Sequence, residues 1–143
     1  MDEAFLVRGQ LGLSCKGSHV IIHAAEKKAA AIGVPMCIAV VDAGGNLVAF
    51  TRMDGARVAS VQIAMTKARS AAMRRRPTAD EMGDDPIHAL RIAHASGSLV
   101  TAMKGGLPIV VDGQVIGGVG ASNGTGDQDL EVVQAGIDAL LNG

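Results

Sequence analysis

Six consecutive apolar residues, Met36-Cys37-Ile38-Ala39-Val40-Val41, constrain the fold of this 143-residue chain more than any other feature. The run is rich in β-branched side chains, and its short length is typical of a strand buried on both faces. It ends at Asp42, and residues 42–46 supply turn chemistry before a second strand-like run at 47–53. The two runs therefore predict an antiparallel hairpin.

Apolar residues recur at helical spacing elsewhere in the chain, and Gly33 and Pro77 stop two of these segments. Acidic residues at 127 and 129 suit the first turn of the last segment, whose cap is Thr125 or Gly126. The predicted helices cover residues 14–32, 56–75, a short stretch that starts at Asp84-Asp85-Pro86, and the end of the chain to residue 141.

Three further strands are expected at residues 99–103, 107–111 and 115–121. A tight Asp112-Gly113 turn joins the last two, which is a strong hairpin signal. Residues 1–143 show no linker, repeat or low-complexity tract, so we expect a single domain. The element order predicts an α+β sandwich around a five-stranded, largely antiparallel sheet.

The composition argues against two classes of partner. Only 1% of residues are aromatic, so the chain lacks rings on which the bases of a nucleic acid could stack. Thirteen basic residues face 14 acidic ones, and the net charge of -1 provides no large positive field for a phosphate backbone. No apolar run approaches the roughly 20 residues that span a bilayer. We therefore expect no nucleic-acid partner and no membrane association.

The apolar content points to self-association. Hydrophobic residues make up 48% of the chain, which is more than one small domain hides, so we expect a homo-oligomer. The acidic start of the chain has no sustained apolar segment of the signal-peptide kind. Two cysteines are too few for a disulfide framework, and these observations favour a cytoplasmic location with reduced thiols.

Cys15, His19 and His23 form the first candidate site. Their i, i+4, i+8 spacing stacks the three side chains on one stripe of the first helix. Helical geometry places this stripe opposite the expected core residues, among them Val20 and Ala24. Imidazole and thiolate are ligands for zinc, iron and haem, so the stripe is a candidate metal or haem site. A face exposed to solvent or to a second subunit is the alternative.

Lys67 is the second candidate. The spacing places it on the far side of the second helix from Val61, Met65 and Ala68. Apolar, hydroxyl and cationic groups together suit a partly buried pocket for an anionic ligand, either a carboxylate substrate or the propionates of haem. A desolvated lysine there can act as a base or nucleophile, and an ordinary surface lysine is the alternative. The residues that share this side are Ser60, Ile63, Ser70 and Arg74.

Other candidates lie at strand ends. Asp42 follows the buried strand beside two glycines, where it can take part in catalysis or form an Asx turn. Arg52 and Asp54 can bind a carboxylate and move a proton, respectively, or pair with each other. The residues assigned to ligand binding are Arg52, Ser70, Arg74 and Ser122.

Several segments, in their order and spacing, resemble the GlcG/HbpS-like family, the haem-degrading-domain family that includes the C-terminal domain of PduO. The resemblance covers nearly the whole chain, from Leu13 to Leu141. The segments that carry it are Gly33-Val34-Pro35, Ala39-Val40-Val41-Asp42-Ala43-Gly44-Gly45-Asn46-Leu47, Arg52-Met53-Asp54-Gly55-Ala56, Ile63-Ala64, Lys67-Ala68-Arg69, Arg76-Pro77-Thr78, Gly105-Gly106-Leu107-Pro108-Ile109-Val110, and the stretch from Gly117 to Ser122 followed by Asp129.

The resemblance implies a profilin-like α/β/α fold and assembly into dimers and higher oligomers, commonly octamers. It also implies haem or another tetrapyrrole as a ligand, because some members bind haem, while others have no settled activity. A porphyrin would pack here on methionine and aliphatic side chains, since the chain has seven Met and only two Phe.

Two alternatives to a binder of haem or of a small anionic ligand stay open. The first is a cofactor-independent isomerase or lyase in which Lys67, with Asp42 or Asp54, moves protons on a carboxylate-bearing metabolite. The second is a structural or sensor oligomer without chemistry of its own.

Overall fold

The computed structural model describes residues 1–79 and 85–143 of the chain. Asp84, the first residue of a predicted helix start, lies outside these ranges. The elements, in chain order, are the 3-10 helix η1 (Glu3–Phe5), α1 (Cys15–Ala31), β1 (Cys37–Asp42), β2 (Leu47–Arg52), α2 (Ala59–Arg74), α3 (Pro86–Ala95), β3 (Gly106–Val111), β4 (Gln114–Ser122) and α4 (Gly126–Asn142).

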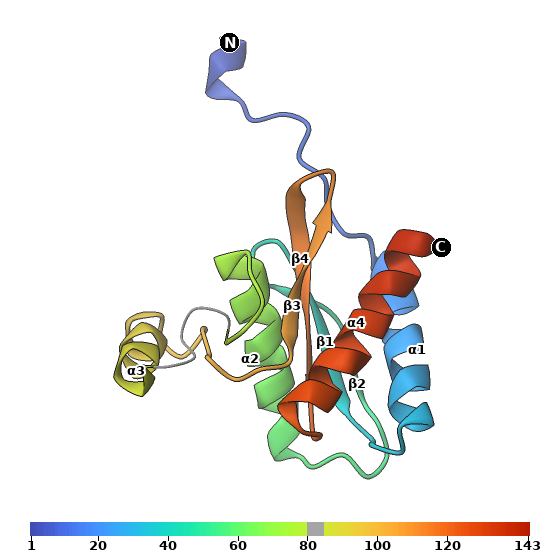
Figure 1. Cartoon of the computed structure of the whole chain (residues 1–143). Coiled ribbons are helices and arrows are strands. Elements are labelled where there is room, and N and C mark those ends of the chain that lie inside the picture. Colours follow the sequence, from blue (N-terminus) through green and yellow to red (C-terminus); the bar gives the residue numbers. More distant parts are fainter. Residues whose placement is uncertain (80–84) are drawn as a thin grey trace.

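The strands form one antiparallel sheet in the order β2-β1-β4-β3. β1 is a central strand, and its residues 37–41 are all buried, as the apolar run predicts. Figure 1 shows α1 and α4 on one face of this sheet and α2 on the other. The α+β class and the antiparallel sheet are therefore confirmed, whereas the profilin-like description stays an expectation.

The predicted strand at residues 99–103 is wrong, and the described sheet has four strands instead of five. The segment runs between α3 and β3, and side chains bond its backbone in place of a neighbouring strand. The Ser70 hydroxyl lies 3.2 Å from both the amide nitrogen and the carbonyl oxygen of Thr101, and the Ser96 hydroxyl accepts from Val100. The serine hydroxyls therefore satisfy backbone amide and carbonyl groups that would pair with a neighbouring strand if the segment were part of the sheet.

The predicted Thr125 cap and the second hairpin are confirmed, and two other helices also begin at a capping side chain. Ser14 caps α1 by accepting from the Gly17 amide, and Asp85 caps α3. Thr125 caps α4 with a capping box. Its hydroxyl accepts a hydrogen bond from the Gln128 amide, and the Gln128 side chain accepts one from the Thr125 amide. Asp112 and Gly113, with φ of 49° and 74°, are both left-handed, as a two-residue hairpin turn requires.

The predicted helix faces were less accurate than the predicted helix ends. Val20, expected in the core, is 40% exposed, and α1 instead buries a neighbouring stripe that includes Ile21 and Ala25. In α2 the expectation for Lys67 was also wrong, because this residue lies on the helix face turned toward the sheet. Both helices are rich in alanine, so their sequences contain little apolar contrast from which a face can be chosen.

The described helices include none that is long and apolar enough to cross a membrane.

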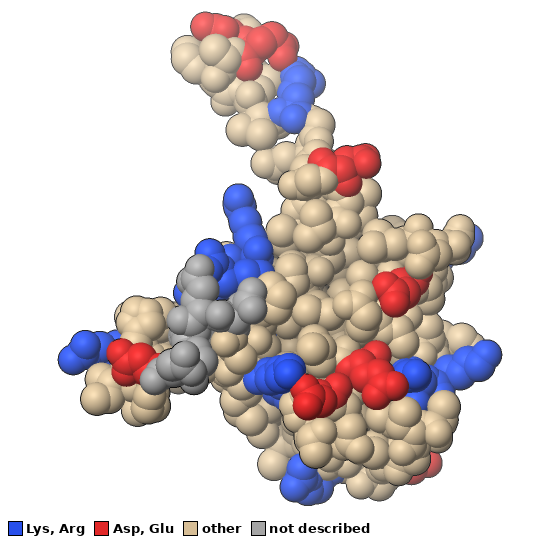
Figure 2. Space-filling view, in the orientation of Figure 1, with Lys and Arg blue, Asp and Glu red and all other residues tan. Residues whose placement is uncertain are grey.

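On the face shown in Figure 2, basic and acidic side chains are interspersed, with one basic group over the C-terminal end of α2. Arg74 and Arg76 lie at that end, where cations favour the negative pole of the helix. This face therefore carries no continuous basic surface.

Glycines in β4 let α2 lie directly against the sheet. A Cβ atom at Gly120 would meet the Ala64 carbonyl oxygen and would lie 2.5 Å from the Ala68 amide nitrogen. A Cβ atom at Gly118 would meet the next turn of the same helix, at Ala68 and Ala72. The short distance between α2 and the sheet therefore depends on glycine in β4 and alanine in α2, because larger side chains would not fit between them.

We predict that Gly120→Ala destabilises the protein, because the new methyl group would collide with the α2 backbone and force the helix away from the sheet. Overpacking of this kind costs about 1–3 kcal/mol. The free energy of unfolding, measured by urea denaturation, should fall by at least this amount. Gly12→Ala is the matched control, because a Cβ atom there meets nothing within 4 Å. Equal stability of the two variants would contradict the proposed contact.

Candidate functional site

An open groove runs between α1 and the edge strand β2. It has two lobes, with volumes of about 750 Å³ and 590 Å³, and His23, Glu26 and Thr51 line both of them. We call this feature the α1–β2 groove. β2 pairs only with β1, so its outer edge is not covered by another described strand. The groove therefore follows an uncovered edge of the sheet.

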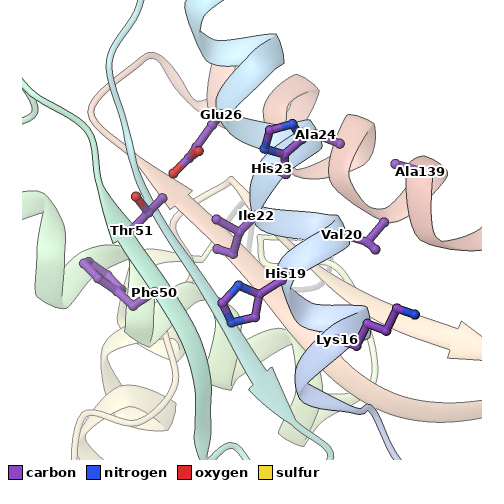
Figure 3. A pocket seen from close by; sticks show the side chains of 10 residues that line it. All are labelled: Lys16, His19, Val20, Ile22, His23, Ala24, Glu26, Phe50, Thr51 and Ala139. Atoms are coloured by element: carbon purple, nitrogen blue, oxygen red, sulfur yellow. The ribbon is translucent and has the colours of Figure 1, made fainter.

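The larger lobe combines imidazole and apolar groups. In Figure 3, His19 and Ile22 project from α1 toward β2, whereas Val20 and Ala139 lie on the α4 side of α1. Phe50 of β2 also lines this lobe, and it packs on the α2 side of the sheet. The site thus pairs a solvent-accessible nitrogen ligand with an apolar wall, which is the usual make-up of a cofactor pocket.

The predicted ligand stripe of Cys15, His19 and His23 comes together only in part. His19 and His23 line the groove, but Cys15 is exposed at the first residue of α1 and is not among the lining residues. Within residues 1–79 and 85–143, no three His, Cys, Asp or Glu side chains are grouped so as to hold a metal ion. Haem iron makes a smaller demand, because the porphyrin supplies four nitrogen ligands and the protein adds only axial ones.

The smaller lobe contains two of the other predicted residues. Arg52, at the end of β2, and Asp54, just after it, both line this lobe together with His23 and Lys27. Across the sheet, Arg52 is the register partner of Cys37. Burial raises the pKa of the Cys37 thiol and the nearby Arg52 opposes this, so the thiol stays protonated and behaves as a small apolar group.

Lys67 lies on the opposite side of the sheet, in a buried ion pair. Its side chain is only 2% exposed, and its Nζ lies 2.8 Å from Asp129 Oδ2 and donates to the Ala121 carbonyl oxygen at 2.9 Å. The other oxygen of Asp129 accepts from the Gly124 amide at 2.9 Å. The ammonium and carboxylate groups are thus both paired and hydrogen-bonded, as buried charges must be.

A cavity of about 380 Å³ adjoins this pair, and we call it the Lys67 cavity. α2 contributes Ser60 and Ile63 besides Lys67, and β4 contributes Ser122. The rim carries two more cations, Arg57 and Lys104. The expectation that Ser60, Ile63 and Lys67 share one pocket therefore agrees with the geometry, although the pocket faces the sheet.

Asp42 does not join Lys67. Its Oδ1 accepts from the Gly44 and Asn46 amides, both at 2.9 Å, so the side chain forms the Asx turn of the β1–β2 hairpin. In the sheet register Asp42 pairs with Gly117, whereas Ser122 beside Lys67 pairs with Cys37. The five-residue difference corresponds to about 17 Å along the strands. The predicted proton-transfer pair of Lys67 and Asp42 is thus separated by the length of a strand.

Two of the four predicted ligand-binding residues lie elsewhere. The Ser70 hydroxyl is taken by the backbone of Thr101. Arg74 is at the C-terminal end of α2, several turns from Ser60. Sequence reasoning also missed the pairing of Asp129, because its position in the first turn of a helix indicates only a favourable interaction with the helix dipole. The available signal was chemical, because a lysine among alanines and serines on a buried helix face requires a carboxylate partner.

Comparison with known proteins adds a consistent family match. Residues 13–138 match the family model of the haem degrading protein HbpS-like family. The chain is 39% identical over 110 residues to Protein GlcG of Escherichia coli strain K12, covering 77% of this chain and 81% of that protein. It is also similar to two crystal structures. Klebsiella pneumoniae ORFY has a TM-score of 0.85 and 31% identity, covering 95% of this chain and 96% of that chain. The PduOC:heme complex has a TM-score of 0.82 and 31% identity, and the match covers 90% of this chain and 95% of that chain.

We predict that Asp129→Asn strongly destabilises the fold, because it leaves the Lys67 ammonium buried without a counter-charge. Removing one partner of a buried ion pair costs about 3–5 kcal/mol. Urea denaturation should show this loss. The matched control is Asp127→Asn, two residues away, because Asp127 pairs with Lys104 at the surface and its loss should cost far less. The double variant Lys67→Met/Asp129→Leu should recover part of the stability, because it removes both buried charges. Equal losses of stability in Asp129→Asn and in the control Asp127→Asn would contradict the role of the buried pair.

Proposed function

The chain belongs to the HbpS-like family, and from this membership and the α1–β2 groove we propose that it is a haem-binding protein. The observation that carries the proposal is the position of His19, which projects from α1 into an open groove with apolar walls. The PduOC structure that the chain resembles is a complex with heme. An axial histidine in an apolar setting is a common way to hold haem iron.

The groove suits the chemistry of the haem molecule in three respects. His19 can supply an axial nitrogen to the iron, and His23 lies one helical turn further along the same wall. Ile22 provides an apolar contact for the porphyrin ring. Lys16 also lines the groove, where its ammonium group can pair with a propionate. Bound haem would supply an iron centre for redox or oxygen chemistry.

We further propose that the protein is a homo-oligomer, between a dimer and an octamer. α3 buries none of its residues, and in Figure 1 it stands apart from the sheet and its covering helices. Two large apolar residues of α3, Ile87 and Leu90, are 60% and 69% exposed. A second copy of the chain that covers this helix would remove both from water.

The exposed Cys15 and buried Cys37 are both free thiols, which supports the proposed cytoplasmic location.

The haem proposal is tested by titrating the purified protein with haemin. We expect a shifted Soret band that saturates at one haem per subunit or per dimer. His19→Ala should weaken binding at least tenfold and alter the band, because the iron loses its axial ligand. His94→Ala is the matched control, since this histidine is on α3 and does not line the groove.

His23→Ala and the double variant His19→Ala/His23→Ala separate the two candidate ligands. If the double variant binds haemin as tightly as the unaltered protein, the groove is not the site. Binding that never saturates and has no distinct spectrum would remove the haem proposal altogether.

The oligomer proposal is tested by analytical ultracentrifugation. We expect a mass of at least two subunits for the unaltered protein. Leu90→Glu should shift the population toward smaller species, because it places a charge in the proposed contact. Asn142→Glu is the control, at an exposed position at the end of α4. A protein that sediments as a monomer at micromolar concentration would exclude this assembly.

A further inference from the structure

Two serine hydroxyl groups at the Lys67 cavity make no hydrogen bond within the described residues. Ser60 and Ser122 are 2% and 5% exposed, and both line the cavity. In the described part of the chain neither hydroxyl makes a hydrogen bond, although the chain buries both residues almost completely. Neither hydroxyl oxygen is sealed off from the cavity, because Arg69 Nε is the one fully buried side-chain polar atom without a partner in the described residues. Both hydroxyls can therefore bond a molecule that enters the cavity.

The cavity also has an excess of positive charge. Three cationic side chains line it, Arg57, Lys67 and Lys104. Lys67 pairs with Asp129 and Lys104 with Asp127, so the excess is the charge of Arg57. The Asp129 carboxylate is already bound by Lys67 and by a backbone amide. The Lys67 ammonium has three N–H donors and two partners within the described residues. One donor is therefore left for a molecule in the cavity.

Arg57 offers a geometric match for a carboxylate. Its Nε donates to the Asn123 side chain at 2.7 Å, which holds the guanidinium at the rim of the cavity. Its terminal nitrogens have no partner in the ranges that the structure describes. A guanidinium group binds the two oxygens of a carboxylate in parallel, so the anchored side chain is oriented for this class of ligand.

The remaining lining residues indicate that the ligand carries a carbon skeleton. Ile63 of α2 and Met103 contribute apolar surface beside the polar groups. A volume of about 380 Å³ is at the lower end of the range for small-molecule pockets. Both features favour a small organic acid over an inorganic ion, which would leave the apolar wall uncovered.

We propose that the Lys67 cavity is a second binding site, independent of haem, for a small organic carboxylate held by Arg57, Lys67, Ser60 and Ser122. The cavity and the α1–β2 groove have no lining residue in common. They also lie on different faces of the sheet, since α2 forms one and α1 the other. The site therefore does not require haem to be bound.

Isothermal titration calorimetry with acetate, malonate and succinate, at constant ionic strength, tests this site. We expect saturable binding of at least one of these probes with one site per subunit. Arg57→Gln and Ser122→Ala should each weaken that binding at least tenfold. Arg57 is exposed, so its variant keeps the fold even if Ser122→Ala disturbs the strand.

Two controls make the result specific. Arg8→Gln removes a cation far from the cavity, and His19→Ala removes the proposed haem ligand, so both variants should bind the carboxylate normally. Sulfate should bind more weakly than the best carboxylate. The proposal is overturned if no carboxylate probe saturates, if Arg57→Gln binds as well as the unaltered protein, or if sulfate binds equally tightly.

Discussion

The close contact between α2 and β4 determines where Lys67 and the cavity beside it lie. Gly118 and Gly120 leave no side chain between strand and helix, so the α2 backbone rests on the sheet. Lys67 is carried on this contact face and extends past the end of β4 to Asp129 in the first turn of α4. The ion pair therefore joins helices from opposite layers around the end of the sheet. A larger residue at Gly120 would shift α2 and misplace the ammonium group.

Local sequence signals predicted the elements well where one conformation dominates. The apolar run 36–41 could form little except a buried strand, and Asp112-Gly113 supplies two residues that accept left-handed backbone angles. Caps such as Ser14 and Thr125 satisfy free backbone amides within three residues, so their effect can be read from neighbouring positions. In each case the deciding interaction is short-range.

The predictions failed where the deciding partner is distant in the sequence. Residues 99–103 have a strand-like composition, but Ser70 bonds Thr101 from 31 positions away. Helical spacing predicts Lys67 on the outer face of its helix, and it gives no sign of the pairing with Asp129, which lies 62 positions away. Of the candidate site, the histidine wall and the Lys67 pocket were predictable as residue types. The separation of Asp42 from Lys67 was not, because it depends on the register of β1 against β4.

The two sites nevertheless share one row of the sheet. Arg52 of the α1–β2 groove and Ser122 of the Lys67 cavity are the register partners of Cys37 on its two sides. Cys37 is fully buried, and its raised pKa keeps the thiol neutral between them. A charge at this position would require solvation that the core does not offer. Register partners lie on the same face of a sheet, and Cys37 packs in the cluster that the alanines of α2 cover. The neutral thiol therefore lets α2 pack closely over a row whose two outer members, Arg52 and Ser122, are polar.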